Sequence, residues 1–365
     1  MQNSCQKQME FAVELGPDSY PVHVGHGLLA RTGEIVRAAG IAGRRCALIS
    51  DSNVLPLYST PLLNGLEASG FHPHIIEIPP GEASKSLGML ERIYYRLAEA
   101  QFDRDSVILA LGGGVVGDLA GFAAATYLRG LPLIQVPTSM VAQVDSALGG
   151  KTAVNLRTAK NLVGAFYQPS LVIADVGLLK SLPEREFREG LSEVIKYGAI
   201  MDAPFIGWLE QEMTMILARD SDRLGEMVER SLRHKAAVVS RDEREGGLRK
   251  ILNFGHTLGH ALEASAAYGN YLHGEAVAIG MAAAAHLSIR YSGLRADDAE
   301  RLEQLLETAG LTIDMPNGWL TGEFSRALRL DKKRRGDTVE FVLLDRLGHA
   351  IIRKLSFDEI VRIED

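Results

Sequence analysis

The chain has few cysteines, only Cys5 and Cys46 among 365 residues. Two cysteines cannot build a disulfide framework, and no Cys-x-x-Cys spacing indicates a structural zinc finger or a redox pair. No uninterrupted apolar run reaches the roughly 18 residues that a membrane span needs, and Met1–Glu10 lacks the apolar core of a secretion signal. We therefore expect a cytoplasmic protein in a reducing compartment, with no membrane partner.

The chain also has fewer positively charged than negatively charged residues. The chain has 39 lysines and arginines against 46 aspartates and glutamates, which gives a net charge of −7. This balance opposes non-specific attraction to nucleic acid, so any site for an anion must be a local cluster of cations. With 46% hydrophobic and 23% charged residues, the composition excludes disordered and fibrous classes, and the length allows two domains.

Short apolar runs alternate with helical patterns in the first half of the chain. Residues 85–100 have apolar side chains at helical spacing and predict a crossover helix. The runs that predict strands are 45–50, 74–78, 106–111, 133–136 and 171–175. This alternation predicts an α/β fold with a mostly parallel sheet.

The second half of the chain changes to long amphipathic segments. These predict helices at 187–200, 223–240, 255–266, 274–292 and 297–309. Two apolar runs, 339–344 and 349–354, predict one hairpin among the helices. Because Pro183 marks the edge of an element, we expect a sheet domain over 1–180 and a mainly α-helical domain over 181–365.

A glycine-rich turn follows the predicted strand 106–111. Gly112, Gly114 and Gly117 satisfy G-x-G-x-x-G between a strand and a helix, where backbone amides can approach a pyrophosphate. A tight turn without a ligand is the alternative. The next strand carries no acid at the usual ribose-binding spacing, and Asp51 is either a substitute partner for the ribose or a residue that caps its own turn.

Several cations lie in or near segments of interest. Glu82 and Lys85 lie at the start of the predicted helix 85–100. Either they face a ligand or they are solvated charges, and the local sequence favours solvated charges. In an acidic protein, cations that converge on one site would indicate an anionic substrate with phosphate and carboxylate groups, whereas solvated surface lysines are the alternative. The candidates are Lys151, Lys160, Lys196, Lys235 and Arg249.

Three histidines lie close together in the sequence. His256 and His260 are one helical turn apart and can share a helix face, while His273 begins the next predicted helix. No glutamate follows His256, which excludes the H-E-x-x-H zinc proteases. Two histidines with a carboxylate, for which Glu193 is attractive, would make a catalytic zinc site; hydrogen-bonded interior imidazoles are the alternative.

Taken together, these segments resemble the 3-dehydroquinate synthase family over about residues 51–342. The resemblance is carried by GGGVVGDLAGFAAATYLRG, VPTSMVAQVDSALGGKTAVN, KNLVGAFYQP, LPEREFREGLSEVIKYG, DEREGGLRKILNFGHTLGHALE and YLHGEAVAIGM. Several motifs in order are far more specific than one glycine motif. The resemblance implies a Rossmann-like N-terminal domain for NAD, a C-terminal helical domain that holds one zinc ion, with cobalt possible, and an active site in the cleft between them.

The resemblance also assigns residues. It implies Glu193, His256 and His273 as metal ligands, and it makes His260 a contact of the substrate or of the ligands. Asp145 would lie between substrate and nicotinamide, and Arg129 would reach the phosphate site of a neighbouring subunit, which implies a homodimer. Implied substrate contacts are Lys151, Asn161, Lys196, Lys235, Arg249, Asn253, His260 and either Lys332 or Lys333. Implied NAD contacts are Asp51, Asn53, Glu82, Lys85, Gly114, Val115, Asp118, Thr138, Ser139, Lys151, Lys160 and Ser181.

The family's reaction converts 3-deoxy-D-arabino-heptulosonate 7-phosphate to 3-dehydroquinate and phosphate, a step of aromatic amino acid biosynthesis by the shikimate pathway. It implies transient oxidation of an alcohol by NAD, elimination of phosphate, return of the hydride and an intramolecular aldol closure. The nearest alternative is another sugar phosphate cyclase, such as a 2-deoxy-scyllo-inosose or 2-epi-5-epi-valiolone synthase. A zinc-dependent polyol dehydrogenase and a non-catalytic NAD-binding protein are more distant alternatives.

Overall fold

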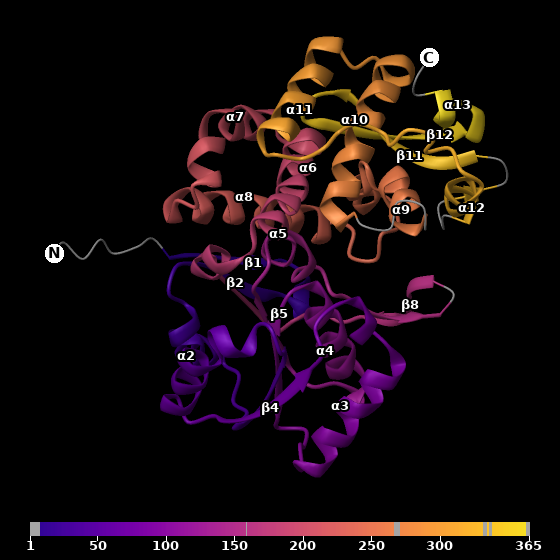
Figure 1. Ribbon diagram of the computed structural model, residues 1–365. Coiled ribbons are helices and arrows are strands. Elements are labelled where there is room, and N and C mark those ends of the chain that lie inside the picture. Colours follow the sequence, from indigo (N-terminus) through magenta and orange to yellow (C-terminus); the bar gives the residue numbers. More distant parts are fainter. Residues whose placement is uncertain (1–7, 158, 266–270, 331–333, 336–337, 363–365) are drawn as a thin grey trace. The chain divides into compact units, whose positions relative to one another are not determined.

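The computed structural model describes residues 8–157, 159–265, 271–330, 334–335 and 338–362 (Figure 1). The chain forms two compact units, one of Met1–Leu182 with Leu224–Arg244 and the other of Pro183–Arg223 with Glu245–Asp365. The sequence predicts one boundary at residue 180. The structure differs, because Leu224–Arg244 returns to the first unit and neither unit is continuous in the sequence. Helical periodicity shows that a segment has an apolar face, but not which unit that face packs against.

The first unit is built on a seven-stranded sheet with the order β1-β2-β9-β6-β5-β3-β4. Its strands are β1 (Met9–Val13), β2 (Tyr20–Gly25), β3 (Arg45–Asp51), β4 (His72–Ile78), β5 (Val107–Gly112), β6 (Leu133–Pro137) and β9 (Leu171–Asp175). Only β1 and β2 pair antiparallel; every other pair of neighbours is parallel. The predicted parallel sheet is confirmed, and its five predicted strands end within two residues of the observed ones.

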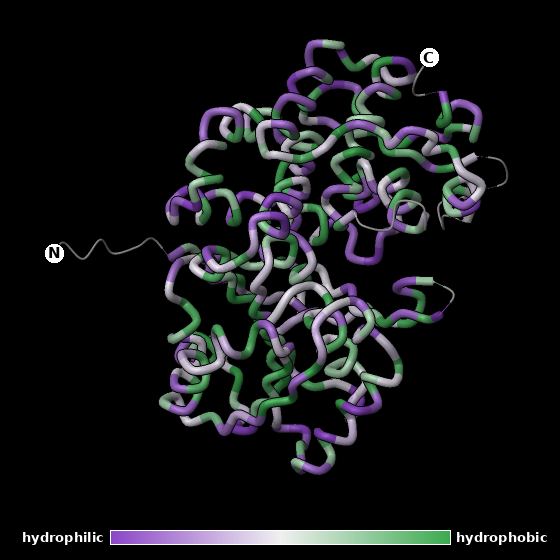
Figure 2. Tube along the Cα trace, in the orientation of Figure 1, coloured by the Kyte–Doolittle hydropathy of each residue, from purple (hydrophilic) through white to green (hydrophobic). Residues whose placement is uncertain are grey.

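Helices cover both faces of this sheet. The helices are α1 (Thr32–Ala38), α2 (Leu55–Ala68), α3 (Leu87–Glu99) and α4 (Gly114–Thr126). In β5, Ile108 and Ala110 pack with residues of α3 and α4, whereas Leu109 and Leu111 pack with residues of α1 and α2. A strand buried on both faces needs a continuous apolar sequence, which explains the Val-Ile-Leu-Ala-Leu run. Figure 2 shows this contrast between hydrophobic central strands and the mixed helices around them.

The order of the strands reverses next to β3. After β3 the chain passes to β4 on one side and then returns to β5 on the other. Because these strands and β6 are parallel, the loops after all four leave from the same edge of the sheet. Such a reversal point at the carboxyl edge is where open α/β sheets bind ligands.

A two-stranded antiparallel hairpin, β7 (Lys151–Leu156) and β8 (Ala159–Phe166), belongs to the same unit. Val154, Val163 and Ala165 pack on the core beside α4, while the opposite face is exposed. In Figure 1 the hairpin extends away from the sheet at β8. The sequence does not predict this hairpin, because its outer face mixes Lys151 and Asn155 with Leu162 and Phe166 and so gives no alternation of polar and apolar residues.

The second unit is mainly helical. Its helices are α5 (Glu184–Glu189), α6 (Leu191–Met201), α7 (Ala203–Leu217), α9 (His256–Ala264), α10 (His273–Ser292), α11 (Ala296–Thr308), α12 (Gly322–Leu330), α13 (Phe357–Val361) and the short η7 (Leu248–Asn253). The chain returns to the first unit in α8 (Ser221–Val239). The predicted helix 187–200 is two helices that meet at Gly190, a residue type of low helix propensity. None of the helices in the described ranges is long and apolar enough to cross a membrane.

A small antiparallel sheet completes the second unit. It consists of β10 (Arg334–Arg335), β11 (Thr338–Arg346) and β12 (His349–Ser356). Strands β11 and β12 pair over most of their length and confirm the predicted hairpin.

Helices α9 and α10 approach closely because glycines line their contact. A Cβ atom at Gly280 would lie 2.0 Å from the carbonyl oxygen of Gly255, and one at Gly259 would lie 3.0 Å from that of Ala276. Gly255 also has a φ of +79°, a conformation that other residues adopt only with strain. These glycines pack the first turn of α9, which begins with His256, against α10 one to two turns after His273.

Replacing Gly280 with alanine should destabilise the second unit, because the new methyl group has no room against the Gly255 carbonyl. We expect a loss of about 1–3 kcal/mol in the free energy of unfolding, measured by urea denaturation. The matched control is Gly207→Ala in α7, where nothing lies within 4 Å of the new methyl group. That variant should gain up to about 1 kcal/mol from helix propensity. Equal stabilities of the two variants would contradict the proposed close approach.

Candidate functional site

Helix α6 buries two charges inside an otherwise apolar segment. Every residue from Leu191 to Ile200 is buried, and the side chains of Glu193 and Lys196 are only 1% and 2% exposed. The ammonium group of Lys196 forms an ion pair with Oε2 of Glu193. A buried ion pair recovers at best part of the cost of removing its charges from water, so this pair points to function rather than to stability.

The second carboxylate oxygen of Glu193 faces two histidines. His256 is the first residue of α9 and His273 the first residue of α10. Oε1 of Glu193 lies 3.4 Å from Nε2 of His256 and 3.4 Å from Nε2 of His273. Tetrahedral ligands at about 2.0–2.1 Å from a zinc ion lie roughly 3.3–3.4 Å apart, so these atoms are spaced as zinc ligands are.

The other nitrogen of each ring faces an oxygen that can only accept a hydrogen bond. Nδ1 of His256 lies 3.1 Å from the carbonyl oxygen of Phe254, and Nδ1 of His273 lies 3.4 Å from Oε2 of Glu263. Each ring therefore keeps a proton on Nδ1 and turns Nε2 toward Glu193. Metal-binding histidines have this arrangement, with the outer oxygen fixing tautomer and ring orientation.

The electrostatics of the cluster favour a cation. Burial holds the pKa of His256 well below its usual range, so that ring is neutral and able to coordinate. Burial also lowers the pKa of His273, but hydrogen bonds to Glu193 and Glu263 outweigh it and raise this pKa to about 10. The carboxylates thus stabilise positive charge at the ring of His273, which a divalent ion would supply in place of the proton. The three predicted ligands meet in one site that suits a metal ion.

Other predicted substrate contacts belong to the same unit. His260 is exposed, and its ring centre lies 5.3 Å from that of His256 and 5.9 Å from that of His273. Segment η7 packs against α6 and carries Arg249, which is 2% exposed, and Asn253, which donates a hydrogen bond of 2.9 Å to Glu245. Lys332 and Lys333 lie outside the described residues.

In the first unit, the glycines of the predicted turn each serve a packing need. A Cβ atom at Gly112 would lie 2.6 Å from Val116, and one at Gly117 would lie 3.0 Å from Gln135 of β6. Gly113 stands at the N-cap of α4 and has no side chain to accept from the first amides of the helix, which include those of Gly114 and Val115. An uncapped helix start next to a tight turn is a ready site for a phosphate group.

The loop after β4 brings charges to the same edge. Lys85 is buried and forms an ion pair with Asp118 of α4, so its interpretation as a solvated charge is wrong. Burial raises the pKa of Asp118, against the opposing effect of Lys85. Glu82 is exposed and accepts a 2.7 Å hydrogen bond from Asn155 of the hairpin. Local sequence could not reveal that this loop folds over α4.

The remaining predicted NAD contacts lie at the end of β3, after β6, after β9 and in β8. Asp51 accepts hydrogen bonds from the amides of Asn53 and Val54 at 2.9 and 3.0 Å, as a turn-capping residue does. The amide of Thr138 donates to the carbonyl of Gly112, which joins the end of β6 to the glycine turn. Further members of the set are Ser139, which accepts from Ala142, Ser181, whose hydroxyl lies by Leu178, and the exposed Lys160.

Lys235 of α8 returns to the first unit and meets Asp145. Asp145 lies in a short π-helical segment, η5 (Ala142–Ser146), a rare conformation often found at functional sites. The ammonium of Lys235 lies 3.0 Å from Oδ1 of Asp145 and donates to its carbonyl at 2.7 Å. Lys151 and Asn161 stand exposed on the hairpin, and Asn161 has a φ of +57°. The structure thus groups these four predicted contacts in the first unit.

Arg129 stands in a strained turn at the end of α4, in η4 (Tyr127–Arg129). Leu128 and Arg129 have φ angles of +51° and +69°, and Gly130 has +130°. A bulky residue in this region costs about 1–3 kcal/mol, and such strain clusters at functional positions. A strained backbone at this turn is compatible with a functional role for Arg129.

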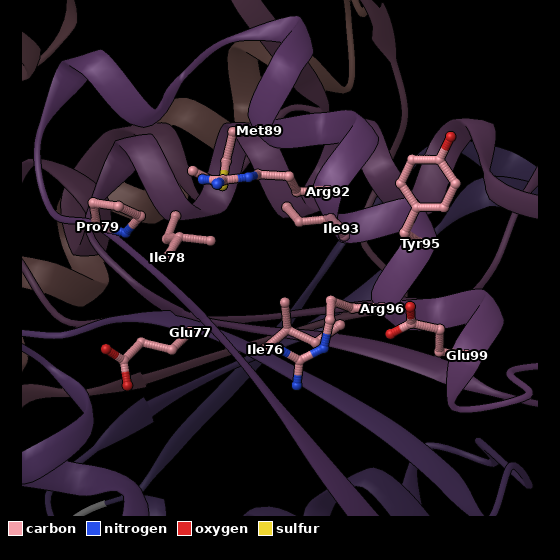
Figure 3. Close-up of a pocket in the computed structure, with 10 residues that line it drawn as sticks. All are labelled: Ile76, Glu77, Ile78, Pro79, Met89, Arg92, Ile93, Tyr95, Arg96 and Glu99. Atoms are coloured by element: carbon pink, nitrogen blue, oxygen red, sulfur yellow. The ribbon is translucent and has the colours of Figure 1, made fainter.

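A pocket of about 370 Å³ lies elsewhere on the first unit, between β4 and α3 (Figure 3). Its lining combines apolar residues with two arginines and two glutamates, and none of them is a predicted site residue. The lining residues are Ile76, Glu77, Ile78, Pro79, Met89, Arg92, Ile93, Tyr95, Arg96 and Glu99. The candidate site is therefore not this pocket.

Two carboxylates beside the histidine cluster are not among the predicted site residues, Glu189 and Glu263. Glu263 could have been found from spacing, because it follows His256 by seven residues, about two helical turns, and so shares its face. Nothing in the local sequence indicates Glu189, whose partner is a backbone amide distant in sequence.

Comparisons with known proteins agree over most of the chain. Family models described as 3-dehydroquinate synthase N-terminal and C-terminal match residues 75–189 and 190–334. A 3-dehydroquinate synthase of Acidithiobacillus ferrooxidans is 50% identical over 340 residues, 93% of each chain.

Two solved structures are similar at 27% sequence identity. One is a 2-deoxy-scyllo-inosose synthase in complex with carbaglucose-6-phosphate, NAD⁺ and Co²⁺, with a TM-score of 0.88 over 97% of this chain and 99% of that one. The other is a 2-epi-5-epi-valiolone synthase of Streptomyces hygroscopicus with NAD⁺ and Zn²⁺, with a TM-score of 0.85 over 94% and 95%. Identity is far higher to the dehydroquinate synthases, and both halves of the chain match their family models. This chain therefore belongs to the 3-dehydroquinate synthase family.

Proposed function

We propose that this protein converts 3-deoxy-D-arabino-heptulosonate 7-phosphate to 3-dehydroquinate and inorganic phosphate, with NAD and one divalent metal ion as cofactors. The observation that carries the proposal is the cluster of Glu193, His256 and His273, with ligand atoms within 4.8 Å of one another and Lys196 beside it. Its support from relatives is the 50% identity to a 3-dehydroquinate synthase.

The three-residue cluster would hold Zn²⁺ or Co²⁺, and the carboxyl edge of the first unit's sheet would hold NAD. When bound, the metal ion supplies a Lewis acid for an alcohol oxygen and NAD supplies a reversible hydride acceptor. Amides at the start of α4 would hold the pyrophosphate, and Lys85 with Asp118 would fix the loop over it. The solved relatives bound to NAD⁺ with Co²⁺ or Zn²⁺ support these assignments.

The chain's own cations would bind and orient a doubly anionic substrate. Arg249 is buried and offers a planar fork of donors suited to a carboxylate or phosphate, whereas Lys196 and Lys235 act as buried point charges. Lys151, Asn161, Asn253 and His260 would add contacts along the substrate. The phosphate of the substrate can itself accept the proton whose removal precedes elimination, so no side chain needs to be the sole base.

The alternative substrates are those of the related cyclases, which carry a phosphate but no carboxylate. The planar donor fork of the buried Arg249 guanidinium matches a carboxylate, so Arg249 favours a substrate with a second anionic group. A polyol dehydrogenase has no need of such cations, since its substrate is neutral.

Turnover of 3-deoxy-D-arabino-heptulosonate 7-phosphate tests the proposal. With metal and NAD present, we expect one phosphate per dehydroquinate and no accumulation of NADH, because the hydride returns within each cycle. Phosphate release and absorbance of NADH are followed together. Net NADH would indicate a dehydrogenase, and turnover only of glucose 6-phosphate or sedoheptulose 7-phosphate would indicate a sister cyclase.

The metal assignment predicts the effect of His273→Ala. This variant loses one of three ligands and should lose its bound metal and its activity while remaining folded. Metal content is measured by elemental analysis and folding by circular dichroism. The matched control is His286→Ala on the same helix, where an exposed histidine pairs with Glu303. A fully active His273→Ala protein without metal would refute the assignment.

Mixed dimers test the proposed role of Arg129 in a neighbouring subunit. Arg129→Ala and Lys151→Ala should each inactivate their own homodimers, and Lys151 is exposed, so its removal should not affect folding. A dimer of one variant subunit with the other would contain one intact site, so purified heterodimers should regain about half of the wild-type activity. If Arg129 acts within its own subunit, no activity will return.

A further inference from the structure

The start of helix α10 lacks an ordinary cap. The N-cap residue, Leu272, has no polar side-chain atom to accept from the first amides of the helix. Instead, Oε2 of Glu189, at the end of α5, accepts a 2.6 Å hydrogen bond from the amide of Gly274. Glu275 accepts from the amide of Leu272 at 2.8 Å. Carboxylates at these positions satisfy unpaired amides and interact favourably with the positive end of the helix.

The contact between Glu189 and α10 is unusually close. A Cβ atom at Gly274 would lie 1.8 Å from the carbonyl oxygen of Glu189, so only glycine lets the start of α10 lie against the end of α5. Gly274 directly follows His273, and Glu193 lies four residues after Glu189 in the next helix, α6. The separation between the two predicted ligands is therefore set through Glu189.

A second carboxylate holds the ring of His273. Glu263 of α9 has a side chain that is 16% exposed, and its Oε2 faces Nδ1 of His273 at 3.4 Å. Because Nδ1 faces this carboxylate, Nε2 faces Glu193. The backbone of His273 is thus fixed from one side and its ring from the other.

We propose that Glu189 and Glu263 are positioning residues that preorganise His273 for the metal ion, and that neither one is a ligand. The inference rests on the proposed function for the identity of the metal site. Glu189 fixes the start of α10 against α5, and Glu263 fixes the tautomer and the direction of the imidazole. Together they remove conformations that a ligand at the first residue of a helix would otherwise sample.

Glu263 also belongs to a second group of potential ligands, with His260 and His273. If Glu263 held a second ion there, His273 would have to bridge two ions through both ring nitrogens. If Glu263 only accepts a hydrogen bond from His273, the proton stays on Nδ1, as the contact between Nδ1 and the Glu263 carboxylate requires. The two roles differ in the number of ions bound, which is measurable.

The experiment titrates metal-free protein with Co²⁺ against a competing chelator and records the visible absorption of the bound ion. Glu263→Gln removes the charge at nearly constant size, and we expect metal affinity to fall about 10–100-fold with an altered cobalt spectrum. Glu189→Ala should also weaken binding, and Glu189→Gln should recover part of the loss because its amide oxygen can still accept from Gly274. These readouts do not depend on turnover.

The matched control is Glu303→Gln, which removes the carboxylate from another histidine–glutamate pair of α10, at 2.7 Å between His286 and Glu303. It should change neither affinity nor spectrum. Thermal unfolding of the metal-free variants separates positioning from stability, since Glu263→Gln should unfold at the wild-type temperature.

Wild-type affinity and spectrum in both Glu263→Gln and Glu189→Ala would overturn the inference, as would two ions bound by the wild-type protein. A loss of affinity matched by an equal loss of metal-free stability would also overturn it. A wild-type protein that binds no metal at all would instead overturn the proposed function. If the wild-type protein binds metal but does not turn over the heptulosonate phosphate, the positioning role stands and only the proposed substrate is wrong.

Discussion

The negative charge of Glu193 is the constraint around which the second unit is organised. It lies within a helix whose neighbouring residues are apolar and buried, where an uncompensated carboxylate would cost several kcal/mol. Lys196 forms an ion pair with one carboxylate oxygen of Glu193, and the rings of His256 and His273 face the other oxygen. The rings reach it because glycines let the first turn of α9 pack directly on α10, one to two turns after His273. The apolar packing of the unit thus serves to hold a polar cluster.

The first unit handles its buried charges differently. Its core strands are apolar on both faces, and charged side chains from loops and helices form pairs outside the sheet. There Lys85 pairs with Asp118, and Lys235 pairs with Asp145. Paired charges at a sheet edge keep their side chains fixed while leaving backbone amides available, which suits the binding of a large polar cofactor.

Much of this organisation could be predicted from the sequence. Buried parallel strands leave continuous apolar runs, and amphipathic helices leave a 3.6-residue periodicity, so most elements predicted from these patterns have ends correct within about two residues. Strands β1 and β2 and helices α1, α7 and α12 are not predicted. The three residues of the cluster Glu193, His256 and His273 are also predicted, because the family motifs that carry them are specific. Helix α2 and the β7–β8 hairpin are also not predicted, because Pro61 lies inside the helix and the outer face of the hairpin mixes polar with apolar residues.

What the sequence could not show is which distant groups meet. The burial of Lys85, the partner of Lys235 and the carboxylates around His273 all depend on contacts between segments far apart in the chain. Periodicity shows which face of its own helix or strand a residue occupies. It does not show which other element packs against that face. The same limit explains why the sequence predicts a single boundary at residue 180.

The return of Leu224–Arg244 to the first unit has a consequence for synthesis. A ribosome releases the complete seven-stranded sheet once residue 182 has emerged, but Asp145 lacks Lys235 until the first helices of the second unit have been made. Domains usually fold one after another during synthesis, whereas here the first unit cannot be finished before the second has begun. Neither unit is a contiguous piece of chain, so a truncation at residue 182 would yield a sheet with its site unfinished.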